Sequence, residues 1–140
     1  MKLPIKARTL PGRLATGAYI LHSGLEKWRD DDEQHAAGIH GTAANAFPFL
    51  KSMSPRRFMR LLAAGEIATG AALLAPFVPA AVAGAALTGF SASLVTMYLR
   101  TPALHKPGSV WPTPAGIGIS KDVWMLGIGI GLIADAATDK

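Results

Sequence analysis

The chain has 140 residues, of which 50% are hydrophobic and 16% are charged, with a formal net charge of +5. This is the length of one domain, but soluble domains normally contain about 25% charged residues. The stretch from Leu61 to Leu99 carries a single charge, Glu66, which a soluble helical domain of this size could not easily cover. The absence of cysteine excludes disulfides, thiolate metal sites and cysteine nucleophiles. We therefore interpret the chain as an integral membrane protein rather than a soluble bundle.

The positive charges are arranged as membrane flanks. Basic residues lie next to the ends of apolar segments, where they would meet lipid phosphates. A nucleic-acid partner would instead require a basic stripe on one face. The flanking residues are Lys2, Lys6, Arg8, Arg13, Lys27, Arg29, Arg56, Arg57, Arg60 and Arg100. We therefore predict the lipid bilayer, and not nucleic acid, as the partner of this surface.

Four apolar segments are candidates to cross a bilayer as helices. A hydrocarbon core about 30 Å thick requires roughly 20 apolar residues in helical form, and the segments are 10–28, 57–75, 79–99 and 119–137. The first segment begins like a signal peptide, but no small-x-small cleavage site follows it, so we predict a retained helix. The sequence thus predicts one all-α domain over residues 1–140, built as a four-transmembrane-helix bundle.

The connections between these segments differ in character. Residues 29–55 form a long polar connection, within which the apolar and aromatic stretch 41–50 is too short to span and is predicted to lie at the membrane interface. Pro76 and Pro79 predict a tight hairpin between the second and third segments. These two segments are rich in alanine and glycine, which predicts that they pack closely as an antiparallel pair. Residues 100–120 are proline-rich and predict an extended surface loop.

The orientation in the membrane is predicted from the basic residues. Four spans place both termini on one side, together with Lys2, Lys6, Arg8, Arg13 and Lys140. The opposite side has more of them: Lys27, Arg29, Lys51, Arg56, Arg57, Arg60, Arg100, Lys106 and Lys121. This excess favours cytoplasmic connections and an outside N-terminus in a bacterial plasma membrane, although the basic N-terminus favours the reverse.

Several short strings resemble the DoxX family of small four-helix membrane proteins. The strings are Arg13-Leu-Ala-Thr-Gly-Ala, Ser23-Gly-Leu-Glu-Lys27, Ala64-Gly-Glu-Ile-Ala-Thr-Gly-Ala-Ala-Leu-Leu74 and Lys121-Asp-Val-Trp-Met-Leu-Gly127. The resemblance covers most of the chain and implies a four-helix membrane fold. The family takes its name from a subunit of a thiosulfate:quinone oxidoreductase, so the resemblance also implies a quinone-linked accessory role. The long connection 29–55 and the proline-rich loop depart from the shortest members of the family.

Glu66 is the principal candidate for intramembrane chemistry. It lies near the middle of its predicted span, where an ionisable group costs several kcal/mol and must face inward toward a partner. Counted along antiparallel helices, His22 lies near the midplane of the first helix and is the predicted partner. This pair could relay protons or hold a quinone carbonyl. The alternative is a structural hydrogen bond between helices.

The remaining candidates are ion pairs at headgroup depth. Arg13 enters the first helix on the side where Asp135 leaves the fourth, which predicts an ion pair between them. On the other side, Lys27 or Arg100 is predicted to meet a carboxylate at Glu26 or Asp122. Charges at this depth are inexpensive, so these pairs are interpreted as interfacial locks rather than sites.

No familiar catalytic or metal-binding motif occurs in the sequence. His35, His40 and His105 lie in the connections without the three or four convergent ligands of a metal site, so we predict no metal. Haem is disfavoured because His22 is the sole histidine in a predicted span, although Met59 or Met97 could supply an axial ligand. Phosphate-binding loops, Ser-His-Asp arrangements and HExxH are missing. No cofactor motif is recognised, which leaves quinone as the possible cofactor.

These observations favour an accessory or structural subunit of a membrane assembly, without catalytic activity of its own. Small-residue faces could receive helices of other subunits or of a second copy. The first alternative is a quinone-linked subunit of an oxidoreductase, with Glu66 and His22 at the quinone headgroup. The second alternative is a small transporter or lipid-binding protein, which a water-filled volume around Glu66 would support and a dry bundle would contradict.

Overall fold

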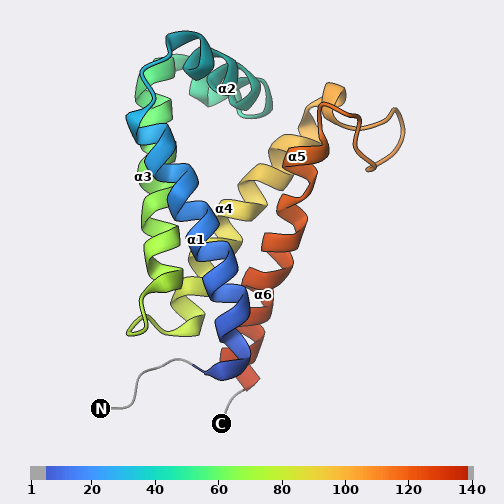
Figure 1. The fold of residues 1–140 in the computed structure, drawn as a ribbon. Helices are drawn as coiled ribbons and strands as arrows, with labels where there is room; N and C mark the ends of the chain where they lie inside the picture. The colour runs from blue at the N-terminus through green and yellow to red at the C-terminus, as the bar shows by residue number, and fades with distance from the viewer. Residues whose placement is uncertain (1–5, 139–140) are drawn as a thin grey trace.

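A computed structural model of the protein describes residues 6–138, and these are organised as helices (Figure 1). Lys2 and Lys140, which entered the orientation count, lie outside the described residues. The α-helices are α1 (Leu10–Arg29), α2 (Glu33–Ala46), α3 (Pro55–Leu74), α4 (Ala80–Arg100), α5 (Ile117–Ser120) and α6 (Asp122–Thr138). Short 3-10 helices are η1 (Ala7–Thr9), η2 (Pro48–Ser52) and η3 (Pro102–Leu104). Residues 6–138 contain no β-strand, so the predicted all-α class is confirmed.

Each of the four predicted segments is helical, and local chemistry explains the boundaries around the proline hairpin. The Ser54 hydroxyl accepts a hydrogen bond from the backbone N–H of Arg57 and caps α3, with Pro55 in the first turn. Helix α3 ends at Leu74, before Pro76, because proline supplies no N–H and disfavours helical geometry in the residue before it. Pro79 then occupies the N-cap of α4.

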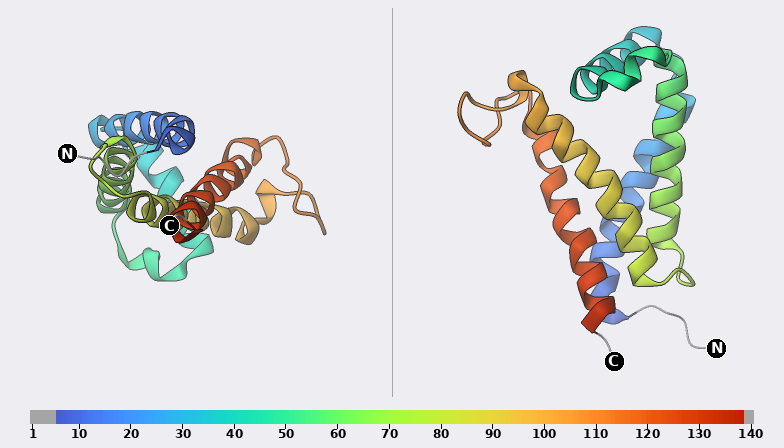
Figure 2. Two further views of the ribbon diagram at one scale, coloured as in Figure 1. Left: turned by 90° about the horizontal axis from the view of Figure 1, so that it is seen from below. Right: turned by 180° about the vertical axis from the view of Figure 1, so that it is seen from behind.

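The helices are arranged as two antiparallel pairs, α1 with α3 and α4 with α6 (Figures 1 and 2). The two pairs lie close together near the chain termini and diverge toward the end that carries α2. Two glycines show how close the pairing is. A Cβ atom at Gly70 of α3 would lie 2.7 Å from the backbone nitrogen of Leu21, and one at Gly84 of α4 would lie 2.9 Å from the carbonyl oxygen of Gly129. Only glycine permits such approaches, which lipid-embedded helices use for tight packing.

This pairing corrects the prediction that the second and third segments form the close pair. Helices α3 and α4 are neighbours in sequence, yet α3 packs mainly on α1 and α4 mainly on α6. Gly70 and Gly84 are indeed positions of close packing, but they face α1 and α6 rather than each other's helix. The sequence shows how many small residues a helix has. Which helix packs against them depends on the angle between α3 and α4, which the sequence does not show.

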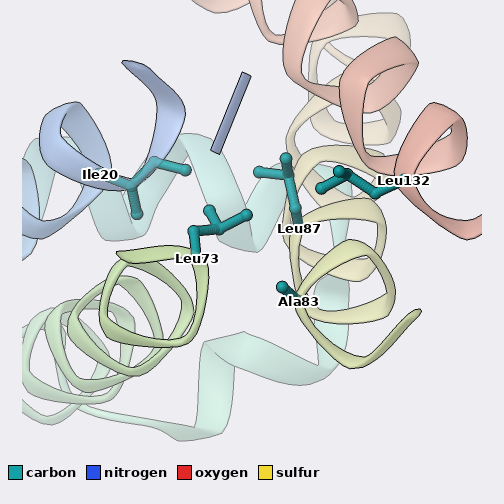
Figure 3. Close-up of a cluster of buried hydrophobic side chains, with 5 residues drawn as sticks. All are labelled: Ile20, Leu73, Ala83, Leu87 and Leu132. Carbon is teal, nitrogen blue, oxygen red and sulfur yellow. The ribbon is translucent and has the colours of Figure 1, made fainter. Parts of the chain in front are cut away.

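A small hydrophobic cluster joins the two pairs. Ile20 and Leu73 approach from α1 and α3, and Ala83, Leu87 and Leu132 approach from α4 and α6 (Figure 3). All five are at most 5% exposed. Leu73 lies in the last turn of α3, so the cluster is near the end of the molecule where the pairs converge. The cluster does not extend to the diverging end of the two pairs.

Helix α2 covers the diverging end, and the sequence did not predict it as a regular helix. The acidic run that begins the polar connection supplies its N-cap, since the Asp32 carboxylate accepts hydrogen bonds from the backbone N–H groups of Gln34 and His35. At its other end, Arg100 of α4 donates to the carbonyl oxygen of Ala46 at 2.9 Å. The connection is therefore a structured cap that is fastened to α4.

Within residues 6–138, two helical stretches are long and apolar enough to cross a membrane, judged by length and composition. These are Ala80–Arg100 and Ile117–Thr138, the second of which combines α5 and α6. Helices α1 and α3 have 20 residues each and thus a similar length, but they carry more charged residues. The structure thus contains two candidate membrane-spanning helices.

Candidate functional site

A cavity of about 530 Å³ lies between the two helix pairs at their diverging end, beneath α2. Its wall is mainly apolar and is built from every α-helix and the segment around η2. The lining residues are Tyr19, Ile20, Ser23, Lys27, Ile39, Ala43, Phe47, Phe49, Leu50, Phe58, Leu62, Glu66, Phe90, Ser93, Leu94, Met97, Ile119, Asp122 and Met125. A largely apolar pocket with a few convergent polar groups is the usual form of a small-molecule site.

The polar part of this wall is centred on Lys27 and Glu66. The Lys27 ammonium donates to both carboxylate oxygens of Glu66, at 3.0 and 3.1 Å, and to the Ser23 hydroxyl at 2.6 Å. Glu66 is 5% exposed. Asp122 lies on the same cavity wall, close enough for the charges of Glu66 and Lys27 to act on it. The cavity wall therefore contains an ion pair between Lys27 and Glu66 and, in the same region, the further carboxylate of Asp122.

The predicted partner of Glu66 was wrong. His22 contacts Glu26 one turn further along α1, at 3.1 Å, and both side chains are about 70% exposed. Gly24 is the α1 residue that lies against Glu66. Helical side chains lean toward the N-terminus of their helix, so Lys27, one turn beyond Gly24, reaches the carboxylate. Glu66 does contact α1 as expected, but its partner is Lys27, which lies on the face of α1 that is turned toward α3.

The predicted pair of Arg13 and Asp135 is also not formed. Arg13 is completely buried and donates to the carbonyl oxygens of Ala72, Leu73 and Ala75 at 2.8 to 3.0 Å. The carbonyl groups of Ala72 and Leu73 lie in the last turn of α3 and have no donor within the helix, and a positive charge there also meets the negative end of the helix dipole. Asp135 instead forms an ion pair with Arg8.

The expected pairs on the other side are likewise replaced. Glu26 is bound to His22, and Lys27 is bound to Glu66 rather than to Glu26 or Asp122. Arg100 meets neither carboxylate, because its guanidinium donates to the last residue of α2 and lies 5.3 Å from the centre of the Phe47 ring. These residues were predicted as interfacial locks, and Arg100 does connect two helices, although through a carbonyl oxygen.

The connection histidines bind neighbouring protein groups. His40 Nε2 lies 2.8 Å from the carbonyl oxygen of Leu50, and His105 Nε2 lies 3.1 Å from that of Leu99. The His35 ring is hydrogen-bonded to Asp30, and this contact lowers the pKa of the Asp30 carboxyl below its usual range. Among residues 6–138, no three potential ligands are grouped so that they could hold a metal ion.

Sequence reasoning identified Glu66 but missed the full composition of the site. Ser23 and Lys27 are four residues apart and thus share a helical face, a signal that was available and was read as a headgroup anchor instead. The contribution of α2 and of Asp122 depends on how the two helix pairs diverge, for which no local sequence signal exists.

Comparison of the chain with family models, with curated proteins and with solved structures finds no match in any of the three. The likeness to the DoxX family therefore rests on the short strings quoted above.

Proposed function

We propose that the protein is a multi-pass membrane protein that binds a small lipid-soluble molecule in the cavity between its helix pairs. The observation that carries this proposal is the composition of the cavity wall. Apolar and aromatic side chains form most of it, while Lys27, Glu66 and Asp122 form one charged region. Such a wall suits a molecule with an apolar body and a polar head.

In this proposal α1 and α3 cross the bilayer together with α4 and α6. Each has 20 residues, about 30 Å of helix, which equals the hydrocarbon thickness. Arg13 in the first turn of α1 and Glu66 near the middle of α3 are directed inward, since both are buried and partnered. Apolar residues such as Leu14 and Leu61 are more than 50% exposed, as expected for contact with lipid. The bilayer is that of a bacterial plasma membrane, with both termini outside.

Single cysteines will test this topology, because the natural chain has none. We expect Ser52→Cys and Ser109→Cys to react with a membrane-impermeant maleimide from the cytoplasmic side, and Phe77→Cys from the outer side. Intact cells and inside-out vesicles distinguish the two sides. If only α4 and α6 crossed the membrane, α3 would not reverse the side, and Ser52→Cys would be labelled together with Phe77→Cys.

A quinone is the ligand class that the DoxX-like strings suggest for this cavity. Leu62 lines the cavity, whereas its neighbour Leu61 is 55% exposed on the outer face of α3. We expect quinone to co-purify with the wild-type protein and with Leu61→Trp, and to be reduced at least about tenfold in Leu62→Trp, since a tryptophan there fills the space. Extraction and chromatography of the purified samples measure the quinone. Equal quinone content in the two variants would contradict binding in this cavity.

A second candidate function is that of an accessory subunit in a membrane assembly. On α6, a Cβ atom at Gly127 or Gly131 would meet no atom of the described chain within 4 Å. These glycines are four residues apart, the spacing by which membrane helices approach each other closely. A partner helix from another subunit or a second copy would fit this face. We expect Gly127→Leu to reduce co-capture of that partner in mild detergent, with Gly65→Leu on the open face of α3 as the matched control.

A further inference from the structure

The charges on the cavity wall do not balance. Lys27, Glu66 and Asp122 are its charged residues at neutral pH, and every other lining residue is neutral. One ammonium therefore faces two carboxylates. The formal charge of the wall is −1, within a surface that is otherwise apolar or aromatic.

Lys27 cannot neutralise both carboxylates. An ammonium group has three N–H donors, and those of Lys27 are used by Ser23 and by the two oxygens of Glu66. The Asp122 carboxylate accepts no hydrogen bond and forms no ion pair within residues 6–138. Lys27 thus acts on Asp122 only through its charge, and not through a direct hydrogen bond or ion pair.

Two further cations near this end, Lys121 and Arg100, are engaged elsewhere. Lys121 precedes Asp122 but lies over the ring of Trp124, 5.9 Å from its centre, and lines a different, outer pocket. Arg100 is held by the carbonyl oxygen of Ala46 and by the Phe47 ring. Neither lines the cavity. No cation of the cavity wall is therefore paired with Asp122, which leaves its carboxylate open to a positively charged occupant.

A half-buried carboxylate beside an apolar cavity is costly without a partner, and a positive charge there would remove the cost. We propose that the cavity takes an amphipathic organic cation, whose charged head pairs with Asp122 and whose apolar body fills the remaining space. Phe58 and Phe90 belong to the same wall and suit the apolar body of such a ligand. This inference rests on the proposed function, and within it names an organic cation as the ligand that the cavity binds more tightly than a neutral quinone.

Three probes with one naphthalene body and different heads will test the proposal. They are 2-(1-naphthyl)ethylammonium, which is cationic at neutral pH, 2-(1-naphthyl)ethanol, which is neutral, and 1,4-naphthoquinone, which offers only acceptors. Equilibrium dialysis against the full chain in lipid nanodiscs, with empty nanodiscs as the background, measures the affinity of each. We expect the ammonium probe to bind at least about tenfold more tightly than the other two.

Matched substitutions on α6 locate the effect. We expect Asp122→Asn to weaken the ammonium probe at least about tenfold and to leave the alcohol unchanged. Asp135→Asn makes the same change at the far end of the helix, outside the cavity, and is expected to change the affinity less than about twofold. Equal affinities for the ammonium and the alcohol, or equal effects of the two substitutions, would overturn the inference.

The failure of this inference and the failure of the proposed function are distinguishable. If the alcohol or the quinone bound as tightly as the ammonium, and Leu62→Trp abolished that binding, the cavity would be a ligand site without preference for cations. If none of the three probes bound, both the cation inference and the binding function would be contradicted.

Discussion

Replacing Lys27 with methionine is expected to lower the free energy of unfolding by about 3 kcal/mol, because Glu66 would remain in the interior without its cation. Glu66 is 5% exposed, and Lys27 is the partner of both of its carboxylate oxygens. Methionine preserves most of the apolar stem of lysine, so the change reports mainly on the lost charge. Reversible unfolding of the purified protein in detergent measures the effect.

Two controls separate this effect from general damage. Lys51→Met makes the same change at an exposed position and is expected to alter stability by less than about 0.5 kcal/mol. The double variant with Lys27→Met and Glu66→Leu should recover most of the loss, since removal of both partners of a buried pair is often nearly neutral. A Lys27→Met protein as stable as the wild type would show that the pair contributes little to the fold.

Replacing Arg13 with methionine is expected to have an effect of similar size, about 3 kcal/mol or more. Three charge-assisted hydrogen bonds would be lost, each worth about 1.5 to 3 kcal/mol before compensation. The carbonyl oxygens of Ala72 and Leu73 would then be left without a donor, next to a side chain that is completely buried. The same unfolding measurement applies.

Arg29→Met is the matched control for Arg13, because it lies in the last turn of the same helix and is exposed. We expect it to change stability by less than about 0.5 kcal/mol. If Arg13→Met were no more harmful than Arg29→Met, water or lipid headgroups would have to replace the guanidinium at the end of α3. The connection between α1 and α3 would then depend on glycine packing and on the ion pair between Lys27 and Glu66.

The sequence by itself determined the helices and the residue around which the site is built. Hydrophobic length and proline placement are local properties, and the segments 10–28, 57–75, 79–99 and 119–137 are all helical. The cost of a charge within an apolar segment is also local, and it predicted that Glu66 is buried and partnered between helices.

The tertiary structure alone decided the pairing of the helices and the partners of the charged side chains. Pairing depends on the angles at which helices cross, which bring Gly70 against α1 and Gly84 against α6. The rotation of α1 then turns His22 outward and Lys27 toward Glu66, and the divergence of the two pairs adds Asp122 to the same cavity. The charge pattern along one helix does not predict the crossing angles or the rotation of the helices, because these result from packing among all the helices at once.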